Sequence, residues 1–152
     1  SPASERSLRL TAPLVAPKRA LVVTVWDPRV GFKVLTPSIA PAPIDIRAAL
    51  ELDESVYEDA RRMAEQGAAT ARQLGFDAEA LAVADVLTVA ATLVRLARER
   101  DAAAIVVGTH GHQAVHEILV GSTARDVIRT APCPVTVVRD AKEREGEDDK
   151  AA

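Results

Sequence analysis

Glycines and a hydroxyl side chain are spaced along the C-terminal half of the chain in a way that suits phosphate binding. Gly108, Gly111 and Gly121 are followed at once by Ser122, and the group lies between an apolar run and a helical pattern. Glycine lets the backbone approach a ligand closely, and inward-facing amides beside a helix N-terminus attract phosphate oxygens. Ser122 can cap that helix and also donate to a phosphate oxygen. The spacing alone is equally compatible with three ordinary turn glycines.

Two better-known phosphate-binding signatures are absent from the chain. It contains no Gly-x-Gly-x-x-Gly after a strand and no Gly-x-x-x-x-Gly-Lys-Ser/Thr. Those patterns are typical of dinucleotide-binding domains and of P-loop proteins. A dehydrogenase and a P-loop hydrolase are therefore disfavoured.

Three histidines, His110, His112 and His116, lie close to these glycines. A catalytic zinc ion needs three ligands that converge on one point, with hydrogen-bonding groups behind them. Alternate residues of a loop point apart, so no metal site is predicted. His110 lies inside the Gly-x-x-Gly turn and is expected to line the phosphate pocket.

No group of residues predicts a catalytic centre. Cys133 lies between two prolines with no evident base and is expected to be a small packed residue. Asp27 and Asp101 lie next to apolar runs and are expected to serve as turn and cap residues. Because nothing combines a nucleophile, a base and an orienting group, no catalytic residue is assigned.

The composition limits the class of protein. The chain has 152 residues, 48% of them hydrophobic, which suits a single domain with its own core. Lys and Arg number 19 against 22 Asp and Glu, and aromatics make up 3%, so nucleic acid is not expected as a partner. One cysteine and the lack of a long apolar stretch favour a cytoplasmic protein that does not contact a membrane.

Apolar runs and helical patterns alternate along the chain. Strands are predicted at 20–26, 102–108 and 134–138, because these runs are apolar and rich in β-branched residues. A fourth strand, nearer an edge, is predicted at 77–84, which alternates partly and follows the break at Gly75. One helix that ends at Gly75 is predicted from a helical repeat of residues that form its inner face. These residues are Val56, Ala60, Met63, Gly67, Ala71 and Leu74. A second helix is predicted at 86–100, with Asp85 as its cap, and a third from Ser122 to about Ala131. A long loop is expected at 28–42 and a charged, disordered tail at 141–152.

This alternation predicts an α/β fold with an open, mostly parallel sheet and helices on both faces. Ligands of such sheets bind beyond the carboxyl ends of the strands. The glycine spacing follows one of these ends directly. Fold and motif therefore predict the same location for a site.

Three segments together resemble the C-terminal half of the universal stress protein family. They are Ile-Val-Val-Gly-Thr-His-Gly at 105–111, Leu-Val-Gly-Ser at 119–122 and Ala-Pro-Cys-Pro-Val-Thr-Val-Val-Arg at 131–139. The resemblance implies a five-stranded sheet of the Rossmann-like, adenine nucleotide alpha hydrolase-like type, over a domain at 1–140. In the ATP-binding branch the glycine loop wraps the phosphates and ribose, and a residue matching Val25 contacts adenine. The implied binding residues are Val25, Val107, Gly108, His110, Gly111, Gly121, Ser122 and Thr123.

The resemblance weakens at the start of the chain, where residues 1–9 look like the segment after the family's first strand. That strand, with its Val-Asp-Gly, is absent from this chain, and its aspartate contacts the nucleotide in relatives. We therefore expect the chain to be N-terminally incomplete. Pro13 falls where the first helix should continue, so that helix is expected to be short or kinked.

The function implied by the resemblance is a regulatory stress-response protein that binds ATP, ADP or AMP, with or without Mg²⁺. It also implies a homodimer that pairs through strand 135–138 across a two-fold axis. Two alternatives stay open: a dimeric interaction protein that binds no nucleotide, and a slow ATPase.

Overall fold

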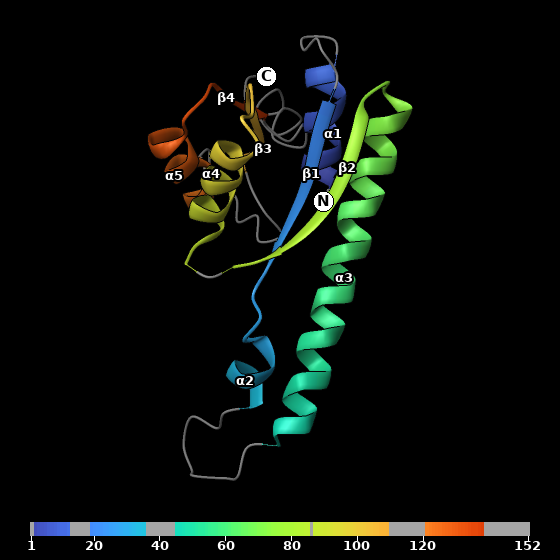
Figure 1. Ribbon diagram of the computed structural model, residues 1–152, viewed down its shortest axis with the longest axis vertical. Coiled ribbons are helices and arrows are strands. Elements are labelled where there is room, and N and C mark those ends of the chain that lie inside the picture. Colours follow the sequence, from blue (N-terminus) through green and yellow to red (C-terminus); the bar gives the residue numbers. More distant parts are fainter. Residues whose placement is uncertain (1, 13–18, 36–44, 86, 110–120, 139–152) are drawn as a thin grey trace, which may run out of the picture.

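Parallel strands alternate with helices, which confirms the predicted α/β class. The computed structural model describes residues 2–12, 19–35, 45–85, 87–109 and 121–138. The elements in chain order are α1 (Pro2–Thr11), β1 (Arg19–Trp26), α2 (Val30–Leu35), α3 (Ile46–Gln73), β2 (Asp77–Ala84), α4 (Val89–Glu99), β3 (Ile105–Gly108), α5 (Ser122–Thr130) and β4 (Val135–Val138) (Figure 1). The predicted tail at 141–152 lies outside the described residues.

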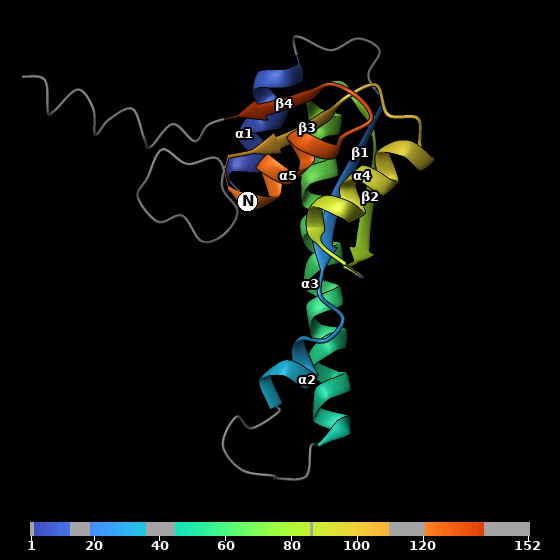
Figure 2. The same cartoon turned by 90° about the vertical axis from the view of Figure 1, so that its left-hand side faces the viewer.

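The described strands pair in two groups. β1 and β2 are parallel along their whole length, and β3 and β4 form a second parallel pair. In Figure 2, β1 and β2 run along the long axis while β3 and β4 run across it. Within the ranges given above, no ladder joins β1 to β3, so a single five-stranded sheet remains a prediction.

Strand bounds follow the apolar runs closely, with one difference at β3. Residues 77–84 form a strand as predicted, but β3 begins at Ile105 and not at Ala102. The amide of Ala102 donates to the carbonyl of Ala97 at 2.9 Å. This bond closes the C-terminal turn of α4, so Ala102 still belongs to the helix end.

α3 is the longest helix, and it has a clear signal at each end. The side chain of Asp45 accepts a hydrogen bond from the amide of Ala48, as an N-cap does. At the other end Gly75 has a φ of 87°, and the amide of Phe76 donates to the carbonyl of Ala71. This is the Schellman arrangement, which confirms the predicted role of Gly75.

A stripe of small residues on α3 packs against β1 and β2 toward the C-terminal end of the helix and against α2 (Val30–Leu35) near its N-terminal end. The buried positions on this helix are Ala49, Asp53, Ala60, Ala64, Ala68 and Ala71. Met63 was predicted on this face but is 36% exposed, because Ala64 takes the inward position. A Cβ on Gly67 would lie 2.8 Å from Cγ1 of Val22, so helix and strand are in very close contact there.

Three of the other helices differ from the prediction or refine it. Residues 28–42 were expected to form a loop, yet Val30–Leu35 is a helix. α4 begins at Val89, and its cap is Thr88, whose side chain accepts from the amide of Ala91 at 3.1 Å. Asp85 is therefore not the cap. α1 is short, as expected, and ends at Thr11, two residues before Pro13.

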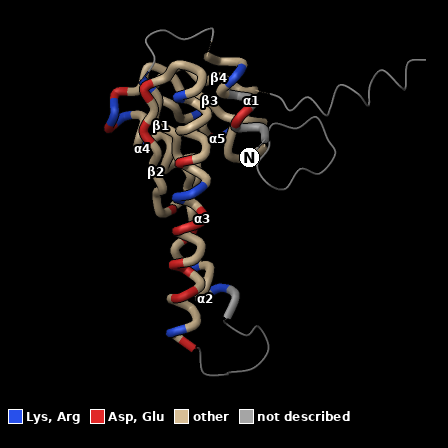
Figure 3. The backbone as a smooth tube through the Cα atoms, turned by 90° about the vertical axis from the view of Figure 1, so that its right-hand side faces the viewer, with Lys and Arg blue, Asp and Glu red and all other residues tan. Residues whose placement is uncertain are grey.

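Charged residues of both signs recur along α3 (Figure 3). Ion pairs one turn apart join Arg47 to Glu51 and Arg61 to Glu58. Such exposed pairs each stabilise a helix by only ~0.3–0.5 kcal/mol. None of the described helices is long and apolar enough to cross a membrane.

Candidate functional site

The residues on either side of the glycine loop are held together by one short backbone contact. The amide of Gly121 donates to the carbonyl of Thr109 at 2.8 Å, and the amide of Thr109 donates to the carbonyl of Val138 at 2.9 Å. The end of β3 and the start of α5 therefore meet beside the end of β4. We call the residues Gly108, Thr109, Gly121, Ser122 and Thr123 the cradle.

Gly121 is required here for close approach and not for its backbone angles. Its φ is −54°, which other residues adopt easily. A Cβ at this position would lie 2.8 Å from the carbonyl oxygen of Thr109, closer than real Cβ atoms come without a shift. Any side chain would therefore push the two halves of the cradle apart.

α5 begins directly at the cradle without a capping side chain. Its N-cap is Gly121, not Ser122, and no side-chain hydrogen bond closes this end. Ser122 is exposed and Thr123 is half-buried at the first turn. An uncapped helix N-terminus has amide hydrogens and a partial positive charge that favour an anion.

Thr109 is a candidate that the sequence did not single out. It is 5% exposed, and its hydroxyl oxygen is buried with no hydrogen-bond partner in the described part of the chain. A buried polar atom without a partner costs about 1–3 kcal/mol. The signal that could have revealed it is its position directly after the last residue of an apolar strand.

Val25 lies near the carboxyl end of β1, in the other strand pair. Trp26 stacks on Tyr57 of α3, with ring centroids 5.4 Å apart, so alternate residues of β1 face this helix. Val25 therefore points to the opposite face, and it is half-buried. Its register partner on β2 is Val83.

Not all of the predicted binding residues are brought together. Val107 and Gly108 end β3 and join Gly121, Ser122 and Thr123 in one place. Val25 belongs to the β1–β2 pair, which no ladder joins to the β3–β4 pair in the part of the chain that the structure describes. His110 and Gly111, together with His112 and His116, lie outside the described residues.

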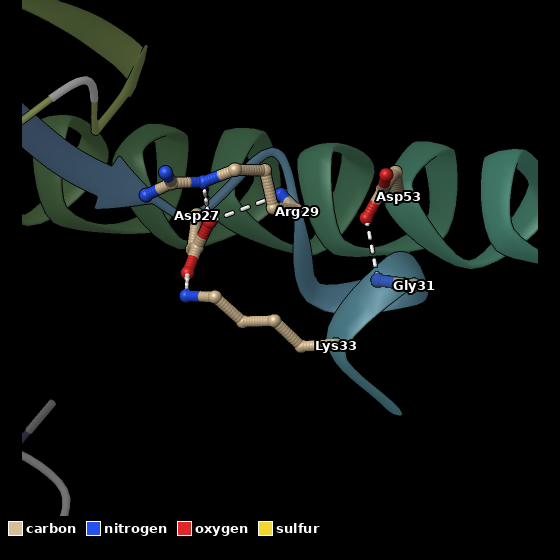
Figure 4. A network of polar contacts seen from close by, with 5 residues as sticks. All are labelled: Asp27, Arg29, Gly31, Lys33 and Asp53. Atoms are coloured by element: carbon tan, nitrogen blue, oxygen red, sulfur yellow. Dashed lines mark hydrogen bonds and ion pairs between the residues drawn. The ribbon is translucent and has the colours of Figure 1, made fainter. Parts of the chain in front are cut away.

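A charged network follows the end of β1 (Figure 4). Asp27 accepts from the backbone amide of Arg29 at 3.0 Å and from the side chains of Lys33 and Arg29. The hydrogen bond from Lys33 is the main reason that the pKa of Asp27 is lowered, and the bonds from Arg29 add to it. Asp27 is thus a turn residue, as predicted. Asp101 is one as well, since it follows α4 with a φ of 48°.

A buried hydrogen bond fixes the segment after this network. Asp53 of α3 accepts from the amide of Gly31 at 2.7 Å (Figure 4). A Cβ on Gly31 would overlap the carbonyl oxygen of Ala49, so α2 lies directly against α3. This contact holds α2 in place but adds no group to the cradle.

Several known proteins are similar to this chain. Universal stress protein MJ0531 of Methanocaldococcus jannaschii is 44% identical over 50 residues, which cover 33% of this chain and 29% of that protein. The aligned stretch is thus less than a third of the relative. Among solved structures, the protein MJ0577 has a TM-score of 0.69 at 23% identity, with 90% of this chain and 87% of that chain covered. This likeness supports the fold.

Two solved structures are somewhat closer in sequence. The universal stress protein from Archaeoglobus fulgidus in complex with dAMP is 26% identical, with a TM-score of 0.59 and coverage of 91% and 89%. A protein of the same family from Burkholderia pseudomallei is 27% identical, with a TM-score of 0.58 and coverage of 89% and 83%. The model of the universal stress protein family matches residues 1–139, so the chain belongs to the universal stress protein family.

Proposed function

We propose that this protein binds an adenine nucleotide, ATP by preference, with the phosphates on the cradle. The amides at the start of α5 and the hydroxyls of Ser122 and Thr123 supply donors to the phosphate oxygens. Gly108 and Gly121 keep side chains out of the way, and His110 and Gly111 complete the loop. Mg²⁺ accompanies the triphosphate and neutralises the phosphate charge that the donors of the cradle leave uncompensated.

One observation carries this proposal: the 2.8 Å hydrogen bond from Gly121 to Thr109 directly precedes an uncapped helix N-terminus. This hydrogen bond holds the two glycine-bearing segments side by side, next to the partial positive charge of a helix N-terminus, which favours an anion. The dAMP complex of the Archaeoglobus fulgidus relative supports an adenine nucleotide as the ligand. Val25 is proposed to contact the adenine on the basis of family resemblance.

The proposed role is regulatory and not catalytic. Nucleotide occupancy biases the shape of the loop from Thr109 to Val120, and a partner or a second copy detects the change, because a ligand shifts a conformation only through its differential affinity. We further propose a cytoplasmic homodimer that pairs through β4. Within the described residues β4 pairs on one edge only, with β3, which leaves its other edge for a partner strand.

Ligand-dependent stability tests the proposal directly. At a nucleotide concentration of about one hundred times the Kd, binding adds ~2.7 kcal/mol to the free energy of unfolding. Thermal unfolding is measured with ATP, ADP, AMP and GTP, each with and without Mg²⁺. ATP should raise the Tm most, whereas no rise with any adenine nucleotide would refute the proposal.

Two hydroxyls on α5 provide a matched pair of variants. Ser122 is at the first turn, and Thr130 is at the last residue, where its hydroxyl donates to the carbonyl of Asp126. A hydrogen bond to a charged group is worth ~1.5–3 kcal/mol, so Ser122→Ala should weaken ATP binding roughly ten- to a hundredfold. Thr130→Ala should leave the Kd unchanged.

A dimeric interaction protein without a nucleotide is the second candidate. The observation that favours it is that Val25 and the cradle belong to separate strand pairs. Native mass spectrometry of the freshly purified protein separates the two functions, because it shows the oligomer and any retained nucleotide together. A dimer that retains no nucleotide and gains no stability from ATP would favour this candidate.

A further inference from the structure

Asp85 follows β2 and lies beside the end of β1. Its amide donates to the carbonyl of Trp26 at 2.6 Å, so the ladder continues one residue beyond the strand. Side chains alternate along a strand, and Val83 and Asp85 therefore point to one face. Val25 is the register partner of Val83 and points to the same face, away from α3.

The carboxylate of Asp85 has an unused acceptor. Its Oδ1 atom is buried and has no hydrogen-bond partner in the part of the chain that the structure describes. The cap of α4 is Thr88, so the carboxylate is not needed to close that helix. A buried carboxylate oxygen without a donor is costly, and such atoms call for an explanation in a native structure.

An apolar side chain is exposed two residues further on. Leu87 is 79% exposed, which is the highest value among the large exposed hydrophobic residues described. The carboxyl end of the β1–β2 pair therefore combines apolar residues, Val25 on its face and Leu87 shortly after β2, with a carboxylate whose Oδ1 has no described donor. A flat heteroaromatic ring that carries an amino group at its edge matches this combination.

We infer that Asp85 is the base-selecting residue of the nucleotide site and accepts a hydrogen bond from the 6-amino group of adenine. This inference rests on the proposed function, and it adds how the base is chosen. In the proposed function the cradle at β3 and α5 holds the phosphates and Val25 contacts the ring. Asp85 lies on the same face as Val25, at the end of the neighbouring strand, which suits it to contact the edge of that ring. Guanine and hypoxanthine have an oxygen at position 6, which a carboxylate repels.

The experiment compares three triphosphates on the full chain. The Kd values of ATP, inosine triphosphate and purine riboside triphosphate are measured by calorimetry for the wild type and Asp85→Ala. The second nucleotide has an oxygen at position 6, and the third has only hydrogen there. The wild type should prefer ATP to the purine analogue by at least about tenfold, since the lost bond is to a charged group. Asp85→Ala should bind ATP and purine riboside triphosphate equally.

Asp77→Ala is the matched control, because Asp77 is an exposed carboxylate at the opposite end of the same strand. It should keep the wild-type preference for ATP. Thermal unfolding without nucleotide adds an independent readout. Asp85→Ala should be at least as stable as the wild type, because it removes a buried oxygen, Oδ1, that has no partner within the described ranges, whereas replacing a structural turn residue would lower the Tm.

The outcomes separate this inference from the proposed function. If the wild type binds ATP but Asp85→Ala retains the preference for the 6-amino group, or lowers the Tm without nucleotide, the assignment of Asp85 is wrong and nucleotide binding stands. If the wild type binds none of the three triphosphates, both the inference and the proposed function fail.

Discussion

Replacing Gly121 with alanine tests the cradle at its narrowest point. A Cβ there would lie 2.8 Å from the carbonyl oxygen of Thr109, whereas ordinary van der Waals contact begins at 3.4 Å. The two segments must therefore separate by roughly 0.6 Å, which stretches their hydrogen bond toward its useful limit. The expected change is local, because alanine tolerates the native φ of −54°.

The predicted effect on stability is small. Weakening one hydrogen bond costs about 0.5–1.5 kcal/mol, and the lower entropy of the unfolded alanine chain restores about 0.4–1 kcal/mol. The net loss should not exceed ~1 kcal/mol in the free energy of unfolding. The effect on binding should be larger, because a binding site tolerates displacements of only about 0.5 Å. We expect the Kd for ATP to rise at least about tenfold.

Gly67→Ala provides a control with the same crowding at a different place. A Cβ on Gly67 would also meet an atom at 2.8 Å, but this atom is a side-chain methyl carbon of Val22, on the face of β1 turned toward α3. Helix propensity favours alanine there by ~0.5–1 kcal/mol, which offsets part of the crowding. Binding of ATP should stay at the wild-type level.

Calorimetric titration with ATP and urea unfolding are both measured for the three proteins. The reasoning is refuted if Gly121→Ala binds ATP as tightly as the wild type. It is also refuted if Gly67→Ala weakens binding to the same degree, since the loss would then follow general destabilisation and not the shape of the cradle.

Three further predictions concern contacts outside the cradle. Asp53→Ala leaves the buried amide of Gly31 without an acceptor, so urea unfolding should show a loss of ~1–3 kcal/mol, with little change in the Kd for ATP. Lys33→Ala should raise the pKa of Asp27 toward its ordinary value, as followed by NMR titration of the carboxyl carbon. Because the folded pKa of Asp27 is lowered, its stabilising effect is present above about pH 4 and is lost as the pH falls through the folded pKa, so the stability difference between Lys33→Ala and the wild type should vanish in acid. Gly75→Ala places a side chain at a φ of 87°, and it should lower the free energy of unfolding by ~1–2 kcal/mol in the same urea assay.

Strands and helix ends with strong local signals could be predicted from the sequence. β2 has the expected bounds because its partly alternating pattern follows the helix end at Gly75 and stops before Asp85. Gly75 ends α3 as expected because few other residues adopt a positive φ. Such signals depend on neighbours along the chain, so they can be read without knowing the fold.

Features that depend on tertiary contacts could not be predicted. α2 lies in a segment rich in proline and glycine, and it is held by a hydrogen bond from Gly31 to Asp53, which is 22 positions away. Met63 fits the helical repeat of the buried face, yet Ala64 is buried instead, because the close contact between Gly67 and Val22 favours small side chains. Periodicity gives the helix but does not decide between adjacent inward positions.

The candidate site was predicted in part, and the missing part is informative. Sequence spacing identified glycines and hydroxyls, which are the residues that suit phosphate. It missed Thr109 and mistook Asp85 for a helix cap, because their significance lies in buried oxygen atoms that have no hydrogen-bond partner among the described residues. Only a structure reveals an unsatisfied atom.

Asp85 and Thr109, which carry these two atoms, each directly follow the last residue of a parallel strand. A third buried hydroxyl without a described partner, in Thr11, ends α1 instead. Selection for stability alone would remove such groups, because replacing each with an apolar residue costs little and removes a desolvation penalty. Asp85 and Thr109 therefore have the property expected of residues kept for a ligand. Each follows a strand end, where α/β proteins bind their ligands.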